Sequence, residues 1–265
     1  MSHGKILVEK RQVSMERYFD INEQGCSIRS KLYCADPAAV KRVALYCHGF
    51  GSYKETKSAE TFAHRIIAKW KGTAVIAFDW PCHGADARKS LLLEDCDTYL
   101  RIVVEYAKQR FEVEDVYAYG ASFGGYLLLK YLSEHGNPFR KVALRCPALA
   151  MYDTLTSSII GEDDLRKIES GKVVLVGFDR QVKVSKHFLD NLREFDVRER
   201  EYFDFADDIL IVHGTADELV SFEASKEFAD ANVIELVAVE GADHRFHDPK
   251  KMDTALACII DFFMK

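Results

Sequence analysis

The stretch G-A-S-F-G at residues 120–124 decides the fold of this chain. Residues 116–119, directly before it, are rich in β-branched and aromatic side chains and predict a short buried strand. The apolar residues 125–132 that follow predict a helix, which the polar segment 133–138 ends. Only one sharp turn fits between this strand and this helix, and a serine stands at its tip.

The glycines of this stretch explain how so tight a turn can form. A strand that reverses into a helix within one residue strains the backbone of the tip residue. Gly120 and Gly124 lack the Cβ atoms that would collide across the turn, and Gly125 lets the helix lie close to the sheet. The Ser122 hydroxyl is then held above the sheet edge, and the Phe123 amide lies at the positive end of a helix, where it can bind an oxyanion. The alternative is a Gly/Ser loop without chemistry, but the flanking strand and helix favour a catalytic turn.

Length and composition narrow the class of protein. A chain of 265 residues, 48% of them hydrophobic, predicts one large α/β domain with a modest insertion. The net charge of −6 and the lack of a basic block argue against nucleic acid or an anionic membrane as the main partner. No segment approaches the roughly 20 continuous apolar residues that span a bilayer. The oligomeric state stays open, a dimer included.

The N-terminus and the cysteines point to a compartment. The first residues hold no apolar run long enough for a signal peptide. The seven cysteines are odd in number, scattered, and without a C-x-x-C pair. We therefore expect reduced thiols and a cytoplasmic location.

Strand and helix patterns alternate along most of the chain. Strands are expected at residues 5–16, 26–34, 42–47, 73–78, 116–119, 141–146, 208–212 and 233–237. Helices are expected at residues 55–70, 97–111, 125–132, 222–229 and 249–263. This alternation predicts an α/β fold with a mostly parallel central sheet and helices on both faces.

The alternation is interrupted in the second half of the chain. Residues 172–176 and 182–185 predict a β-hairpin, and residues 159–169 and 186–193 predict short helices beside it. We expect a core formed by residues 1–147 and 205–265, with residues 148–204 inserted as a small cap over the sheet. The alternative is a long surface excursion without function, but unusually long connections tend to be lids or binding loops.

The chemistry of a serine nucleophile requires two partners. A serine hydroxyl needs a base to attack a carbonyl at neutral pH, and the base needs an orienting acid. Asp217 follows the strand expected at residues 208–212, and His244 follows the strand expected at residues 233–237. The carboxyl ends of parallel strands meet at one edge of a sheet. Ser122, Asp217 and His244 should therefore gather there, in the chain order Ser…Asp…His.

Other residues compete for the roles of base and acid. Three further histidines stand at strand ends or in a turn-rich loop, where histidine more often braces a turn: His48, His83 and His213. His244 is preferred because it follows the last strand. Three other carboxylates lie near the preferred pair and could instead cap a turn or helix: Glu218, Asp243 and Asp248. Asp217 is preferred because the acid must reach the far nitrogen of the base from a separate strand end.

The segment H-G-F-G at residues 48–51 predicts a second oxyanion donor. Gly49 permits a tight turn, and the amide of Phe50 can then face that of Phe123. The alternative is a plain turn. Metal chemistry is disfavoured, because the adjacent pairs at residues 47–48 and 82–83 point to opposite faces of a strand. No G-x-G-x-x-G follows the first strand, which weakens nucleotide binding.

Five motifs taken in order resemble the α/β-hydrolase superfamily: residues 48–51, 79–84, 120–125, 213–217 and 241–244. Within it, the chain is most similar to small bacterial esterases of the cinnamoyl/feruloyl type, which carry a comparable cap and a His-Gly-Phe oxyanion loop. The resemblance implies Ser122 as nucleophile, Asp217 as acid and His244 as base. It also implies the amides of Phe50 and Phe123 as oxyanion donors, and neither cofactor nor metal. Ala121 is a departure, since the family often has histidine there.

The resulting hypothesis is a serine esterase that works through an acyl-enzyme on a small-molecule ester. Phe50, Phe123 and Phe178 would line an apolar pocket for a small aromatic or short aliphatic acyl group. A peptidase of the aminopeptidase type or a thioesterase could use the same triad. A binding module that kept the fold without catalysis is the alternative from another class.

Overall fold

A computed structural model describes residues 15–86, 88–177 and 180–265, and its centre is an eight-stranded sheet in the order β1-β2-β4-β3-β5-β6-β9-β10. β1 pairs antiparallel with β2, and β2 pairs antiparallel with β4. Every later pair in the sheet is parallel, which confirms the mostly parallel sheet predicted. The strands are β1 Met15–Glu23, β2 Cys26–Cys34, β3 Arg42–Cys47, β4 Thr73–Phe78, β5 Val116–Ala121, β6 Lys141–Arg145, β9 Ile209–Gly214 and β10 Glu235–Val239.

The central strands are apolar along their whole length because both faces of the sheet are covered. Every residue of β4, β5 and β9 is buried. The side chains of α1 (Lys57–Lys69) and α8 (Pro249–Met264) pack with one face of the sheet. Those of α2 (Leu93–Phe111), α3 (Phe123–His135) and α7 (Phe222–Asn232) pack with the other face.

Local sequence signals set where several helices begin. The Thr56 side chain accepts a hydrogen bond from the Ala59 amide at the start of α1. Asp248 does the same for the Lys250 amide at the start of α8, where Pro249 occupies the first helical position. Within the described residues, no helix is both long and apolar enough to cross a membrane.

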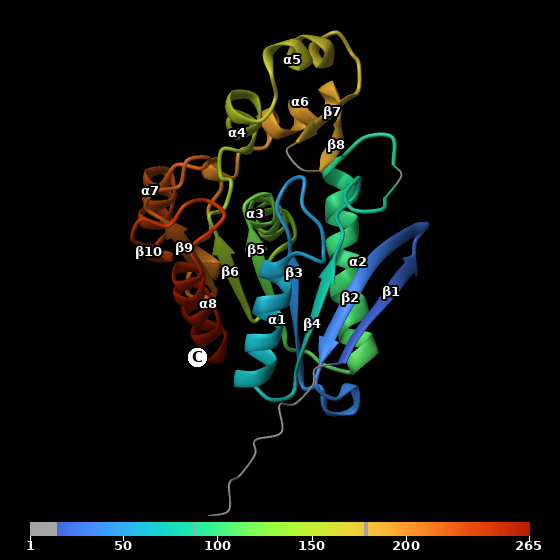
Figure 1. Ribbon diagram of the computed structural model, residues 1–265, viewed down its shortest axis with the longest axis vertical. Helices are drawn as coiled ribbons and strands as arrows, with labels where there is room; N and C mark the ends of the chain where they lie inside the picture. The colour runs from blue at the N-terminus through green and yellow to red at the C-terminus, as the bar shows by residue number, and fades with distance from the viewer. Residues whose placement is uncertain (1–14, 87, 178–179) are drawn as a thin grey trace, which may run out of the picture.

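The segment between β6 and β9 forms the insertion. It contains α4 (Met151–Ser158), α5 (Glu162–Glu169), β7 (Val174–Gly177), β8 (Gln181–Val184) and α6 (Lys186–Glu194). Two short 3-10 helices, η2 (Val197–Glu199) and η3 (Phe203–Asp208), lead back to the core, and a third, η1 (Pro37–Ala39), precedes β3. β7 and β8 pair antiparallel as the predicted hairpin. In Figure 1 the insertion stands beyond the carboxyl ends of β3, β4 and β6.

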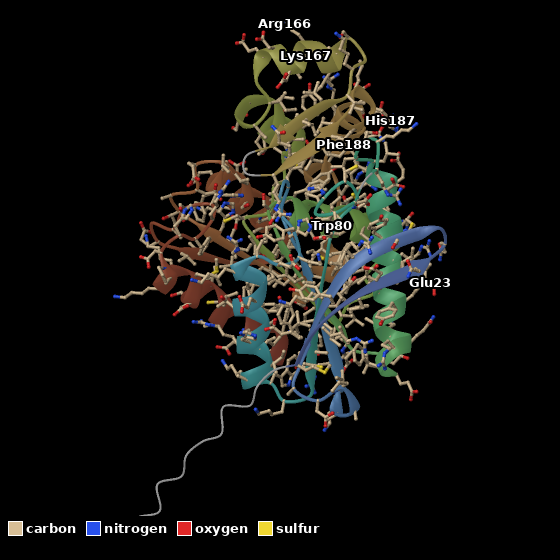
Figure 2. All side chains as sticks on the ribbon, turned by 45° about the vertical axis from the view of Figure 1, so that its right-hand side comes forward. Glu23, Trp80, Arg166, Lys167, His187 and Phe188 are labelled. Carbon is tan, nitrogen blue, oxygen red and sulfur yellow. The ribbon has the colours of Figure 1, made fainter. Side chains whose placement is uncertain are left out.

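The insertion has a buried base and an exposed tip. Phe188 on α6 is fully buried, and its ring lies 6.3 Å from that of Phe123 on α3. Figure 2 shows Arg166 and Lys167 at the opposite, outer end of the insertion. The base of the insertion is therefore part of the same hydrophobic core as α3, whereas its tip faces solvent.

β1, α2 and α4 show the largest differences from the prediction. The first strand was expected at residues 5–16, but β1 spans Met15–Glu23; residues 5–14 lie outside the described residues. Ile21 is the one fully buried residue of β1, so a mostly exposed edge strand gives a weak hydrophobic pattern. α2 begins at Leu93 rather than at residue 97. α4 was not predicted, because Met151 and Leu155 alone among its residues are buried.

Candidate active site

Ser122 occupies the strained turn that the sequence predicts. It lies between β5 and α3, with φ 53° and ψ −116°, and its amide donates to the Arg145 carbonyl over 3.0 Å. A Cβ at Gly120 would lie 2.8 Å from the Gly124 carbonyl oxygen, and one at Gly124 would overlap the Cys47 carbonyl. Side chains at these two positions would force the turn open, so the glycines keep the serine in place.

His244 brings its imidazole to the Ser122 hydroxyl. Nε2 of His244 lies 3.0 Å from Ser122 Oγ, and Nδ1 lies 2.7 Å from Asp217 Oδ2. The loop that carries His244 is held at two backbone atoms. The His244 amide donates to Glu218 Oε2 over 3.2 Å, and the His244 carbonyl accepts from Arg145 Nη1 over 2.9 Å. The structure thus brings together the three side chains that the sequence placed at one sheet edge.

Asp217 is buried and fully engaged in hydrogen bonds. Its Oδ1 accepts from the amides of Leu219 and Val220 at 2.9 and 2.8 Å. Its Oδ2 faces His213 Nε2 at 3.1 Å as well as His244. Burial opposes ionisation, but the hydrogen bonds from His213 and His244 outweigh it and hold the pKa of Asp217 well below its usual range. Asp217 is therefore a carboxylate at neutral pH.

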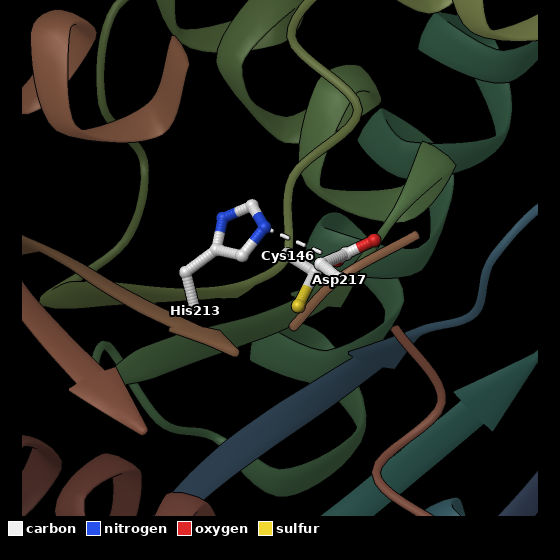
Figure 3. Close-up of side chains that lie close together, drawn as sticks. All are labelled: Cys146, His213 and Asp217. Carbon is white, nitrogen blue, oxygen red and sulfur yellow. Dashed lines mark hydrogen bonds and ion pairs between the residues drawn. The ribbon is translucent and has the colours of Figure 1, made fainter. Parts of the chain in front are cut away.

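A second histidine and a cysteine lie behind Asp217, as Figure 3 shows. His213 Nε2 faces both Asp217 and the Val220 carbonyl, so this nitrogen carries the proton. His213 Nδ1 then accepts from the Ser225 hydroxyl at 2.8 Å. Burial raises the pKa of the Cys146 thiol far above neutrality, so it stays protonated.

These donors do not fit a metal ion. A metal at Cys146, His213 and Asp217 would need a thiolate and would displace the hydrogen bonds that orient Asp217. Two other groups of side chains with metal-binding spacing exist among the described residues, and cations of the chain already pair with both. Lys31 pairs with Glu16 in one, and Lys130 pairs with Asp97 and Glu134 in the other.

Two buried histidines hold the loop at residues 48–51. His48 Nδ1 donates to the Gly49 carbonyl over 2.8 Å, while its Nε2 accepts from the Trp80 amide. His83 Nδ1 donates to the Pro81 carbonyl, and its Nε2 accepts from the Gly51 amide at 3.1 Å. Burial lowers the pKa of His48 to about 4 and that of His83 to about 3, so both are neutral. The two histidines brace the loop on either side of Phe50.

The residues predicted as oxyanion donors lie side by side. The rings of Phe50 and Phe123 are 5.8 Å apart and nearly perpendicular. Phe123 begins α3, so its amide belongs to the first turn, where N–H groups have no partner within the helix. The Phe123 side chain, predicted to line the acyl pocket, is instead fully buried and stacks with His83 and Tyr126.

A cavity of about 460 Å³ opens at Ser122. Core and insertion both line it, and the lining residues include Tyr46, Phe50, Ser58, Ser122, Arg145, Met151, Ile159, Arg180, Leu219 and His244. Phe178, predicted to contribute from the insertion, lies outside the described residues. The volume of the cavity is that of a small-molecule site.

The competing residues have other partners. Asp243 Oδ1 accepts from the His247 amide, and Asp248 caps α8. Sequence reasoning missed Arg145, whose guanidinium lines the cavity. The available signal was an arginine directly after the apolar residues of β6.

Several solved structures resemble this chain. Est1E from Butyrivibrio proteoclasticus with bound ferulic acid shares 22% identity and a TM-score of 0.75, over 93% of this chain and 100% of that one. A hydrolase from Agrobacterium vitis S4, described as putative, is 18% identical with a TM-score of 0.73, over 95% of this chain and 99% of that one. Esterase Pf2001 from Pyrococcus furiosus is 16% identical with a TM-score of 0.69, over 95% of this chain and 92% of that one. None of the curated proteins matches significantly.

The sheet order, the strained turn at Ser122 and the structural neighbours define the α/β-hydrolase fold. A family model narrows the assignment. The model of the prolyl oligopeptidase family matches residues 66–265, more than half of the chain. The chain therefore belongs to the prolyl oligopeptidase family.

Proposed function

We propose that Ser122, His244 and Asp217 are the nucleophile, base and acid of a carboxylic ester hydrolase. The observation that carries this proposal is the pair of contacts at His244, 3.0 Å to the Ser122 hydroxyl and 2.7 Å to the Asp217 carboxylate. Asp217 is ionised and can only accept, so His244 Nδ1 carries the proton. Nε2 is then free to accept a proton from Ser122.

The reaction follows from this tautomer. Ser122 Oγ attacks the acyl carbon while its proton passes to His244 Nε2. The amides of Phe50 and Phe123 stabilise the oxyanion, and Asp217 stabilises the imidazolium. His244 then protonates the leaving alcohol, and the acyl-enzyme remains on Ser122. Water, deprotonated by the same imidazole, releases the acid. No step requires a cofactor.

The cavity supports a small ester as substrate. Phe50, Met151, Ile159 and Leu219 give it an apolar part that suits a small aromatic or short aliphatic acyl group. The structural neighbour Est1E binds ferulic acid, an aromatic acid of this size class. We therefore propose that the acyl group packs against the Phe50 side of the cavity.

Peptide hydrolysis is the second candidate, because the matching family model is that of prolyl oligopeptidases. The same nucleophile and base serve amide and ester cleavage. The difference lies in which leaving group the cavity accepts, so substrate panels separate the two functions.

The experiment combines active-site labelling with turnover. Wild type should react with a fluorophosphonate probe and hydrolyse 4-nitrophenyl acetate and butyrate. Ser122→Ala should lose both, with turnover reduced by up to about 10⁶-fold. Ser133→Ala is the matched control, because that hydroxyl bonds within α3 to the Lys130 carbonyl. Equal labelling of wild type and Ser122→Ala would refute the proposal. A panel of proline-containing peptide anilides then decides between esterase and peptidase.

A further inference from the structure

Arg145 is a buried cation at the wall of the cavity. It ends β6, beside Ser122, whose amide donates to the Arg145 carbonyl. The residue is 8% exposed, and it lines the same cavity as Ser122 and His244. Its side chain thus combines near-complete burial with access to the space where a substrate binds.

In the part of the chain that the structure describes, the guanidinium of Arg145 has few partners, and none of them carries a charge. Nε donates to the Tyr119 hydroxyl and Nη1 to the His244 carbonyl, both at 2.9 Å. The Phe246 ring lies 5.2 Å from its Cζ. Guanidinium has five N–H donors, so three are left without a partner among the described residues. Across those same residues, no carboxylate lies within ion-pair distance of Arg145.

A buried charge without a counter-charge is costly, and an arginine cannot escape the cost by losing its proton. The nearest acids of the site are already committed: Asp217 to four donors, and Glu218 to the His244 amide. Burial also raises the pKa of the Tyr119 hydroxyl to about 12, so Tyr119 supplies no negative charge at neutral pH. The compensating charge is therefore absent from the described part of the chain.

The rest of the cavity has the same sign. Arg180 lines it as well, and its described lining contains no aspartate or glutamate. This contrasts with the chain as a whole, whose net charge is −6. Arg180 is exposed at the cavity, with its guanidinium stacked 3.5 Å from the Tyr53 ring. Ser58 also lines the cavity, and its hydroxyl is buried.

We infer that the cavity is built for an ester that carries a carboxylate, with Arg145 as the residue that binds it. The planar guanidinium matches a carboxylate in shape and can donate two parallel hydrogen bonds. The Ser58 hydroxyl supplies a further donor, and Arg180 attracts the anion to the opening. This inference rests on the proposed ester hydrolysis, because it names the substrate class of that site. The carboxylate can belong to the acyl group or to the alcohol.

The experiment uses two rigid pairs of esters, each made of an anionic ester and a neutral counterpart. For the alcohol side, 4-carboxyphenyl acetate is compared with its methyl ester. For the acyl side, phenyl 4-carboxybenzoate is compared with its methyl ester. We expect the anionic member of one pair to have a kcat/KM roughly ten- to a hundredfold higher, the range of a charge-assisted hydrogen bond. The pair that shows the preference identifies the side.

Variants separate binding from structure. Arg145→Gln should abolish the preference for the anionic ester, and Arg180→Gln should reduce it. The ratio of the two rates is the readout, because a merely structural role of Arg145 would slow both esters equally. Arg140→Gln is the matched control, since Arg140 precedes β6, is largely exposed and pairs with Asp115. It should leave the ratio unchanged.

The outcomes are distinguishable from failure of the proposed function. Equal kcat/KM within both ester pairs in wild type would overturn the inference even if Arg145→Gln fails to fold. If no ester is cleaved, ester hydrolysis fails, and calorimetry with benzoate and 4-hydroxybenzoate on wild type then tests the anion site alone. Binding that disappears in Arg145→Gln or weakens in Arg180→Gln supports the site. Lack of binding by wild type overturns it.

Discussion

Replacing His83 with alanine tests whether the loop at residues 48–51 must be held rigid for turnover. The substitution removes the acceptor of the Gly51 amide and the donor to the Pro81 carbonyl. It also removes a ring, 2% exposed, that packs against Phe50 and Phe123. Phe50 then keeps the support of His48 on one side and loses that of His83 on the other.

The expected magnitudes follow from these contacts. An amide left without its partner costs about 1–3 kcal/mol, and the space left by the ring adds about as much. We therefore expect the free energy of unfolding to fall by about 2–6 kcal/mol. Complete loss of one oxyanion donor costs about 10²–10³ in turnover. A donor that is loosened rather than removed should cost less, so kcat should fall by about ten- to a hundredfold with little change in KM.

The assay must separate a slower site from fewer folded molecules. Turnover of 4-nitrophenyl acetate is divided by the number of sites that a fluorophosphonate probe labels, and stability is measured by urea unfolding. His83→Gln is the control, because its side-chain oxygen can accept from the Gly51 amide as Nε2 does. A kcat per labelled site within twofold of wild type in His83→Ala would refute a positioning role for His83.

Two further predictions concern charge. Burial holds the pKa of His48 at about 4, so below pH 6.5 the unfolded chain binds a proton that the folded chain does not. For this histidine, the free energy of unfolding should fall by about 1.4 kcal/mol for each unit by which the pH is lowered from 6.5 to 4. Urea titrations at several pH values would show this slope, and His48→Gln should flatten it. Asp217→Asn should lower kcat by about 10⁴-fold, because an amide offers His244 no ionised acceptor. Asp243→Asn should change kcat less than twofold. If steady-state assays show the reverse order, the role of acid belongs to Asp243.

The parts of the fold that the sequence predicted are those where local chemistry and burial agree. β4 and β5 are buried on both faces, and their continuous apolar runs left little choice of structure. The turn at Ser122 was predictable because a Cβ atom at either of its glycines would collide with backbone atoms, so only glycine fits there. The part of β1 after residue 16 was not predicted, because its one fully buried side chain, Ile21, carries almost no periodic signal.

The parts of the site that could not be predicted depend on tertiary contacts. His213 stands at a strand end like His48, and nothing in its neighbours reveals that it donates to Asp217. Arg145, which ends β6, was assigned no role from the sequence. Its role depends on Tyr119, one strand away, and on the backbone of His244, 99 residues further along the chain. Spacing along a sequence does not encode which of several strand-end residues share a carboxylate or a cavity.

The two buried charges of the site differ in what surrounds them, and this difference separates rate from selectivity. The negative charge of Asp217 accepts hydrogen bonds from His244, His213 and two amides, and these contacts fix the orientation of His244. Within the described ranges, the positive charge of Arg145 meets neutral acceptors only, and the residue lines the cavity. A change at Asp217 should therefore slow every substrate by a similar factor. A change at Arg145 should alter the ranking of substrates, because the field it removes acts only on those that bring a charge of their own.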